Sequence, residues 1–347
     1  MKRISFIAVI LVSCCLLYGQ ENKINYQCLD SVPGWLRENK VPSVAIAFLE
    51  NGKLTEAKVY GELKKGITAP PDAIYNVASL TKPVTAILTL MLVNAGKWKL
   101  DEPLYHYWTD PDIKEDPRNK QLTTRIVLSH RTGFLNWRWN NGNTRLAFQF
   151  DPGTKYQYSG EGFEYLRKSL ERKFGQSLEK LARKYLFEPL TMTDTRFTWD
   201  TAFENKFAGW HDRNGENSYE TRKRDDICAA DDLMCTINDY GKFAQFVLNR
   251  AGLSPTLFNE MSATQVKVGE HLTYGLGWLV VRDLPADEYA IVHSGADIGV
   301  RAIIILLPKS KRGVIVFTNG DNGQKIIKDI VAAALDCGPM LIKYMSQ

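Results

Sequence analysis

A serine and a lysine spaced three residues apart are the strongest candidates for chemistry in this sequence. Ser79 and Lys82 lie in the stretch S-L-T-K at residues 79–82, and a long apolar run follows. If that run is a helix, the lysine lies one turn from the serine on the same face. Unpaired backbone N–H groups and the positive end of the helix dipole would then surround the serine hydroxyl. An amine kept neutral by burial could take the serine proton and leave a nucleophile for acyl transfer.

The setting of Ser79 distinguishes it from a second serine–lysine pair with the same spacing. Ser177 and Lys180 begin a stretch typical of an amphipathic surface helix, in which the lysine would be solvated and charged. Pro83 is tolerated near a helix start, which places Ser79 at the N-terminus of a helix that its apolar residues predict to be buried. A helix cap by the serine, with a lysine that reaches solvent, is the alternative. This segment alone leaves both interpretations open.

Two further polar positions could contribute to the same chemistry. Tyr158 lies in a turn-rich stretch before a predicted helix, where its hydroxyl could reach a cleft or its ring could simply pack. His293 ends a predicted strand, and the small residues Ser294 and Gly295 after it would let a substrate approach the backbone. This histidine could donate a hydrogen bond, act as a base, or make a structural bond. His130, by contrast, is interpreted as a structural residue that fixes a loop.

Antiparallel strands are predicted at both ends of the chain. Residues 43–49 and 54–60 flank Asn51 and Gly52, a pair that favours a hairpin turn. Four later runs also predict strands: 277–282, 289–293, 301–307 and 313–318.

These elements predict an α/β (α+β) architecture with one antiparallel sheet flanked by helices. The sheet part is expected from about 28–94 and 260–347, covered by the Ser79 helix and by a C-terminal helix at 324–335. The region of about 95–259 is expected to be inserted and mainly helical. A cleft between the two parts is the expected place for a site.

Composition and charge are those of an ordinary globular protein. A chain of 347 residues suffices for one large domain or two, and its hydrophobic content is 44%. The net charge of +5 is mild and not concentrated, so no nucleic-acid partner is indicated. The histidines lack metal-binding spacings such as H-E-x-x-H, and we expect neither a metal nor another cofactor.

A targeting segment is expected at the N-terminus. Two basic residues precede an apolar run at 4–17 that is too short to span a membrane stably. A signal peptide of residues 1–19 would leave 20–347 as the mature domain, so we expect export to the periplasm or secretion. Lipoprotein processing at Cys14, within L-V-S-C, stays open, although the apolar stretch continues beyond it.

The mature chain would keep four cysteines: Cys28, Cys228, Cys235 and Cys337. Export permits disulfides, and four cysteines allow three pairings. Buried free thiols are an equally good interpretation.

Taken in order, these motifs resemble the serine β-lactamase and penicillin-binding-protein superfamily. The resemblance is closest to its class C β-lactamase, D-aminopeptidase and esterase-like branch. The stretch at 79–82 resembles the S-x-x-K element, Y-S-G at 158–160 the Y-x-N element, and H-S-G at 293–295 the K-T-G or H-x-G element. Four connecting stretches also resemble the family: G-K-W-K-L-D-E-P at 96–103, L-S-H-R-T-G at 128–133, E-P-L-T-M-T-D-T at 188–195 and Y-G-L-G-W at 274–278. Their order and spacing, over nearly all of the mature chain, are more specific than any one motif.

The resemblance implies an acyl-enzyme mechanism without a cofactor. Ser79 would be the nucleophile, and Lys82 and Tyr158 would share the work of general base, with the division between them open. The tyrosine would also relay the proton to the leaving group. His293 would orient this network or contact the substrate. Backbone N–H groups of Ser79 and Ala296 would form the oxyanion hole. Three small residues would line the substrate site: Gly160, Ser294 and Gly295.

Two departures from the family pattern bear on the substrate. Gly160 replaces the asparagine of Y-x-N, and His293 replaces the lysine of K-T-G, which removes a fixed positive charge suited to a substrate carboxylate. Losing one charge-assisted hydrogen bond costs roughly 1.5–3 kcal/mol, or about one to two orders of magnitude in rate. We therefore expect weak or absent β-lactamase activity.

The sequence thus predicts an exported serine hydrolase that acts on an ester, amide or peptide bond. Its partner would be a small-molecule or peptide substrate with an acyl group, and its oligomeric state stays open. A β-lactamase or D-Ala-D-Ala carboxypeptidase is one alternative, and a non-catalytic binder of cell-wall fragments is another. Substrate choice is expected in cleft loops at 134–150 and 203–232, with Trp137 and Trp139 as candidate walls.

Overall fold

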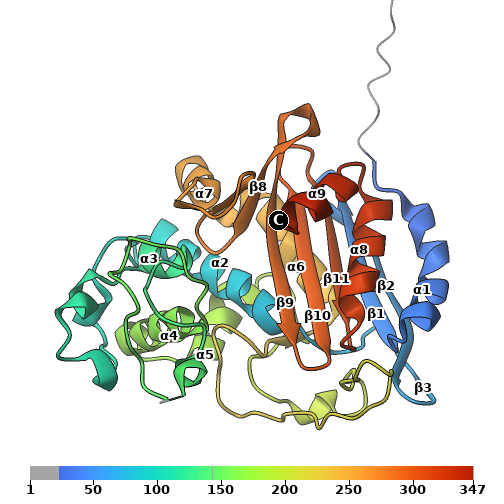
Figure 1. Cartoon of the computed structure of the whole chain (residues 1–347), viewed down its shortest axis with the longest axis horizontal. Helices are drawn as coiled ribbons and strands as arrows, with labels where there is room; N and C mark the ends of the chain where they lie inside the picture. The colour runs from blue at the N-terminus through green and yellow to red at the C-terminus, as the bar shows by residue number, and fades with distance from the viewer. Residues whose placement is uncertain (1–22, 143, 347) are drawn as a thin grey trace, which may run out of the picture.

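The computed structural model describes residues 23–142 and 144–346 of the chain. Within these residues, nine strands form one sheet in the order β3-β2-β1-β11-β10-β9-β8-β7-β6, with every neighbouring pair antiparallel. The first and last parts of the chain therefore share a sheet, which confirms the predicted fold class (Figure 1). The expected signal peptide and the possible lipid anchor at Cys14 lie outside the described residues.

Six of the eleven strands in the described residues correspond to the predicted runs, and five short strands were not predicted: three at the edges of the main sheet and two that pair apart from it. Asn51 and Gly52 form the β1–β2 turn, and both have positive φ angles, 52° and 71°, as this turn type requires. The main sheet comprises β1 (Ser43–Glu50), β2 (Lys53–Lys64), β3 (Ile67–Thr68), β6 (Val266–Lys267), β7 (Leu272–Tyr274), β8 (Leu279–Leu284), β9 (Glu288–Asp297), β10 (Val300–Leu307) and β11 (Arg312–Thr318), and the small pair is β4 (Tyr75–Asn76) with β5 (Met234–Cys235).

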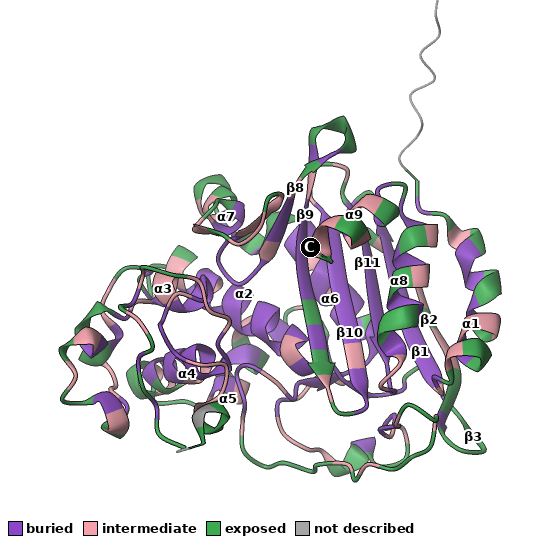
Figure 2. Cartoon of the chain, viewed as in Figure 1, coloured by how far each residue is buried: buried purple, intermediate pink, exposed green. Residues whose placement is uncertain are grey.

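Both faces of the sheet are covered, which explains why its central strands are apolar without alternation. Figure 2 shows β10 and β11 buried along most of their length. In β1, Val44, Ile46 and Phe48 pack into the cluster that contains α1 (Val32–Asn39), α8 (Gly323–Ala334) and α9 (Gly338–Met345). The alternate residues of β1 face the opposite cluster.

The opposite face is covered by a helix that the sequence analysis did not place there, in addition to apolar residues of the Ser79 helix. α6 (Ile237–Leu248) contacts β1, β2, β10 and β11 there, whereas α2 (Thr81–Asn94) packs against α5 (Leu178–Ala182). The apolar residues of α2 surround the helix, so it is buried between helices as well as near the sheet. The remaining helices are α3 (Thr124–Leu128), α4 (Gly160–Phe174) and α7 (Pro255–Ser262), and a π-helical turn at Arg183–Phe187 follows α5.

Two further predictions concern membrane association and disulfides. In the part of the chain that the structure describes, no helix combines the length and apolar character needed to cross a bilayer. Cys28, Cys228, Cys235 and Cys337 are all buried free thiols, which agrees with the interpretation that did not require a disulfide.

Candidate active site

The turn that carries Ser79 is held in a fixed conformation by its neighbours. Ser79 lies in a short 3₁₀ helix, Ala78–Leu80, directly before α2. Ala78 has a φ of 46°, and its N–H donates to Asn76 Oδ1 at 2.7 Å. Thr81 Oγ1 donates to the Ala78 carbonyl at 2.6 Å and accepts the N–H of Leu233 at 3.0 Å. The serine is therefore presented on a rigid, mostly buried turn.

Lys82 makes the contact that its spacing predicts. Its side chain is fully buried, and Nζ donates to Ser79 Oγ at 2.9 Å and to the Ala230 carbonyl at 2.8 Å. The other pair behaves differently, because Ser177 Oγ accepts the backbone N–H of Lys180 and caps α5. In the described structure no side chain caps α2, so the capping interpretation of Ser79 finds no support.

Tyr158 lies beside this pair, immediately before α4. The Lys82 Nζ atom is 4.6 Å from the centre of the tyrosine ring. The ring also stacks on His130, with centroids 4.3 Å apart, and lies 6.1 Å from the ring of His293. Ser159 Oγ accepts the N–H of Gly162 and caps α4, which fixes where the helix begins. The structure thus brings together the four side chains that the sequence proposed as catalytic.

His293 is a buried residue of β9, and its ring is electrically neutral at ordinary pH. Burial, with a smaller effect from Lys82, lowers the pKa of His293 to about 3. Nδ1 is 2.9 Å from the Ser294 carbonyl, which can only accept, so Nδ1 carries the proton and Nε2 has a free lone pair. Nε2 is buried and has no hydrogen-bond partner among the described residues. The position therefore supplies a hydrogen-bond acceptor rather than a fixed positive charge.

The backbone after His293 borders the serine turn. β8 pairs with β9 as far as Val292, so the strand edge beyond it faces the 3₁₀ helix instead of another strand. A Cβ atom on Gly295 would lie 2.4 Å from the Val77 carbonyl oxygen, which explains why glycine occupies this position. Ala296 follows, and it is exposed, as is Ser294. This arrangement is compatible with the expected oxyanion hole at the N–H groups of Ser79 and Ala296.

Gly160 has a structural explanation that the sequence did not reveal. A Cβ atom at this position would lie 2.7 Å from Cη2 of Trp137, and two other atoms of the same indole would be 2.9 and 3.0 Å away. Trp137 in turn stacks on Trp139, with centroids 5.0 Å apart and planes 8° apart. The tryptophan therefore occupies the space that the first atoms of an asparagine side chain would need.

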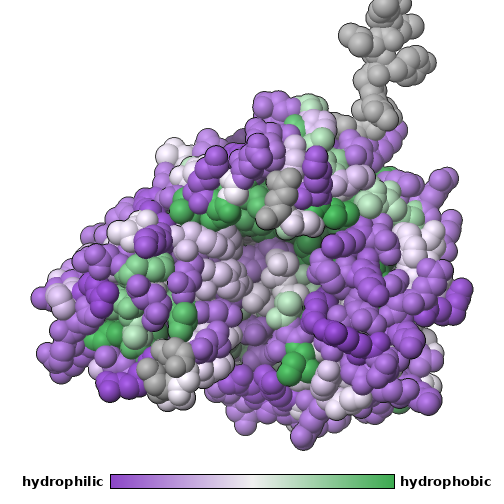
Figure 3. Space-filling view, viewed as in Figure 1, coloured by the Kyte–Doolittle hydropathy of each residue, from purple (hydrophilic) through white to green (hydrophobic). Residues whose placement is uncertain are grey.

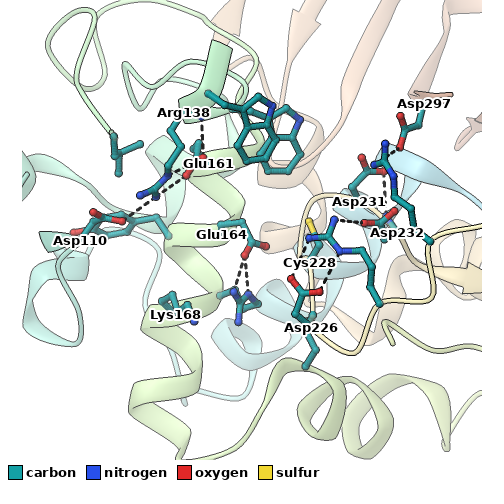
Figure 4. Close-up of a pocket in the computed structure, with 18 of the residues that line it drawn as sticks. Asp110, Arg138, Glu161, Glu164, Lys168, Asp226, Cys228, Asp231, Asp232 and Asp297 are labelled. Carbon is teal, nitrogen blue, oxygen red and sulfur yellow. Dashed lines mark hydrogen bonds and ion pairs between the residues drawn. The ribbon is translucent and has the colours of Figure 1, made fainter. Parts of the chain in front are cut away.

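A cavity of about 580 Å³ is lined by Glu161, Asp231 and Asp297, each of which directly follows a residue of the site in the chain. The four proposed catalytic residues are not among its lining residues. The molecular surface is hollowed between the helical part and the sheet (Figure 3). Both predicted cleft loops contribute to the cavity lining, including Trp137 and Trp139. Ion pairs line its walls: Arg138 binds Asp110 and Glu161, and Arg224 binds Asp226 and Asp232 (Figure 4). Charged side chains thus line the cavity mostly as compensated pairs.

Three carboxylates at one end of the cavity were missed by the sequence analysis. Oxygen atoms of Asp231, Asp232 and Asp297 lie within 4.8 Å of one another. Arg224 is 3.1 Å from Asp232, and Arg222 is 3.9 Å from Asp297. Burial, assisted by the charge of Asp232, raises the pKa of Asp231 to about 7. In the sequence, the adjacent acidic residues 231–232 are a weak signal of such a cluster. The approach of Asp297 from β9 has no sequence signal.

Comparisons with known proteins agree with this geometry. The Beta-lactamase family model matches residues 28–336. Protein flp from Staphylococcus aureus (strain MRSA252) is 23% identical over 309 residues, which cover 82% of this chain and 60% of that protein. The chain therefore spans about 60% of the length of this curated relative.

Two solved structures share the fold. D-amino acid amidase from Ochrobactrum anthropi SV3, in complex with L-phenylalanine, has a TM-score of 0.74 at 20% identity. D-alanine carboxypeptidase AmpC from Burkholderia cenocepacia has a TM-score of 0.73 at 18% identity. Each similarity covers 88% of this chain and 98% of the other.

The fold and the family match define the class of protein: a member of the superfamily that includes β-lactamases and penicillin-binding proteins. Within that class, the chain belongs to the Beta-lactamase family.

Proposed function

We propose that this protein cleaves an ester, amide or peptide bond through an acyl-enzyme formed on Ser79. The observation that carries the proposal is the 2.9 Å hydrogen bond between Lys82 Nζ and Ser79 Oγ at a buried turn. A lysine held in that position can take the serine proton as the hydroxyl oxygen attacks. The surrounding residues favour an esterase or peptidase whose substrate does not need to carry a carboxylate group.

The reaction would proceed in two steps, acylation and deacylation. In acylation, Ser79 Oγ bonds to the substrate carbonyl carbon while its proton passes to the Lys82–Tyr158 pair. The resulting oxyanion accepts hydrogen bonds from the N–H groups of Ser79 and Ala296. When the intermediate collapses, the bond to the leaving group breaks, and Tyr158 returns the proton to that group. In deacylation, water attacks the acyl-serine, gives its proton to the same pair, and the serine is released with its proton restored.

The neutral ring of His293 bears on which acyl compounds would bind. β-Lactams and the D-Ala-D-Ala terminus carry a carboxylate that a lysine at this position would pair with. A neutral imidazole with an acceptor nitrogen offers no such charge. Gly160 lacks the side-chain amide of the family's asparagine, and Trp137 fills the space that such a side chain would occupy. Both features favour the esterase or peptidase proposal over a β-lactamase.

The related structures keep two alternatives in view. One neighbour is named as a D-amino acid amidase and another as a D-alanine carboxypeptidase, so amide substrates belong in any test. A non-catalytic binder on the same scaffold is disfavoured by the short Lys82–Ser79 contact, which a binding function alone does not require.

A substrate panel on the protein without its first 19 residues tests the proposal. The panel contains p-nitrophenyl esters of increasing acyl length, D- and L-amino acid amides, a chromogenic cephalosporin and a D-Ala-D-Ala peptide. The expected result is turnover of at least one ester or amide that Ser79→Ala abolishes, with little or no cephalosporin hydrolysis. Equal turnover by the wild type and Ser79→Ala would refute the proposal.

A further inference from the structure

His130 contacts three consecutive residues around the proposed proton-relay tyrosine. Its carbonyl oxygen accepts the N–H of Gln157 at 2.8 Å, and its ring nitrogen Nδ1 accepts the N–H of Ser159 at 3.0 Å. Between these two bonds, its ring stacks on Tyr158 with centroids 4.3 Å apart and planes 29° apart. The one residue thus fixes the backbone on both sides of Tyr158 and the face of its ring.

The hydrogen bond to Ser159 defines the state of the histidine ring. An Nδ1 atom that accepts an N–H carries no proton, so the proton of the neutral ring lies on Nε2. Burial, with the charge of Lys82 as the next largest effect, lowers the pKa of His130 well below its usual value. Nε2 is buried without a hydrogen-bond partner among the described residues. A buried unpaired donor costs free energy, and an apolar side chain at this position would avoid that cost.

The environment of His130 favours an aromatic ring that also carries one hydrogen-bond acceptor. Phe163 and Tyr274 pack around it, with ring centroids 5.4 and 4.8 Å away, and its backbone holds a φ of 53°. Phenylalanine could keep the stack but could not accept from Ser159. Asparagine could accept but could not stack. Histidine is the side chain that supplies both contacts to the Tyr158 segment.

We propose that His130 is a positioning residue, which holds the Tyr158 ring against Lys82 so that the tyrosine can relay the proton during acyl transfer. This inference rests on the proposed function for its catalytic consequence. Its structural part, the placement of the ring, stands independently of any activity. A displacement of about 1 Å in a reacting group can cost on the order of 10²-fold in rate.

The structural part is tested by crystal structures of the wild type and of His130→Phe. The wild type is expected to keep the Lys82 Nζ atom near 4.6 Å from the centre of the Tyr158 ring. The variant is expected to show the ring displaced or in alternative conformers, because the N–H of Ser159 has lost its acceptor. A Tyr158 ring that superposes on the wild type within coordinate error would overturn the proposal, whether or not the protein is a hydrolase.

The catalytic part is tested by a double-mutant cycle with Tyr158→Phe, using the best substrate of the panel. His130→Phe is expected to lower kcat by about 10- to 100-fold with little change in KM, and to cause no further loss when Tyr158 is already replaced. The matched control is Phe187→Leu, a buried ring that stacks on Phe197 and lies outside both cleft loops. Its effect should be on thermal stability rather than kcat.

Equal loss of kcat in both backgrounds would mean that His130 acts through general stability, which contradicts the proposal. If His130→Phe does not fold, His130→Asn replaces it in the same cycle with the same expected non-additivity, since it loses the stack on Tyr158. If Ser79→Ala retains full turnover, the proposed function has failed, and the crystal structures still decide whether His130 positions the tyrosine.

Discussion

Restoring an asparagine at Gly160 should destabilise this protein rather than repair its motif. The first side-chain atom added there would lie 2.7, 2.9 and 3.0 Å from three atoms of the Trp137 indole. Non-bonded carbon atoms are most favourable about 3.5–4.0 Å apart, so one of the two groups must move by roughly 1 Å. Trp137 cannot shift freely, because it stacks on Trp139 with planes 8° apart.

The expected size of the effect follows from this overlap. Forcing extra atoms into a filled space typically costs about 1–3 kcal/mol. For a chain of this length, each kcal/mol lowers the melting temperature by about 2 °C, so Gly160→Asn should lower it by roughly 2–6 °C. The loss should shrink when Trp137→Ala is introduced as well, because the two substitutions share one space and are not additive.

Differential scanning fluorimetry of four proteins measures this effect: the wild type, Gly160→Asn, Trp137→Ala with Gly160→Asn, and a matched control. The control is Gly175→Asn, at the C-terminal end of the same helix. That position has a φ of 63°, which asparagine tolerates, and an added Cβ would have no neighbour within 4 Å. Equal melting temperatures for Gly160→Asn and Gly175→Asn would refute the account of why glycine stands beside Tyr158.

Two other substitutions give measurable outcomes. Lys82→Met keeps the length of a fully buried side chain but removes its amine. This substitution should lower kcat/KM by about 10²- to 10⁴-fold without lowering the melting temperature. A loss of less than about tenfold would argue against the role of Lys82 as a base. Asp231→Asn should remove a pH dependence of stability. The pKa of Asp231 is raised to about 7, so the wild type loses stability as the pH rises from about 4 to 7. Relative to the wild type, the variant should therefore gain about 1–4 kcal/mol between pH 4 and pH 8 by urea unfolding, and parallel curves for the two proteins would contradict this.

Patterns within one segment predicted well what the structure contains. The strands β10 and β11 were visible as apolar runs because both of their faces are buried. The Ser79–Lys82 contact was visible because helical periodicity alone brings residues three apart together. The order of the later motifs added Tyr158 and His293, and the structure places Tyr158 beside the lysine and His293 beside Tyr158.

Features that depend on several distant segments could not be predicted in the same way. The Ala230 carbonyl that binds Lys82 comes from a loop 148 residues further along the chain. Trp137 fills the space beside Gly160 because of a loop conformation, not a periodic pattern. The placement of α6 on the sheet depends on packing against β1, β2, β10 and β11, which come from both ends of the chain. These contacts are set by tertiary packing, which has no signature in a local stretch of sequence.

The most direct test of the central claim is the intact mass of the protein after treatment with a fluorophosphonate probe. The account predicts one covalent adduct on the wild type, located by peptide mapping at Ser79. It also predicts no adduct on Ser79→Ala and markedly slower labelling of Lys82→Met, since the amine 2.9 Å from Oγ takes the serine proton. An adduct at another residue, or equal labelling of the wild type and Lys82→Met, would contradict the account.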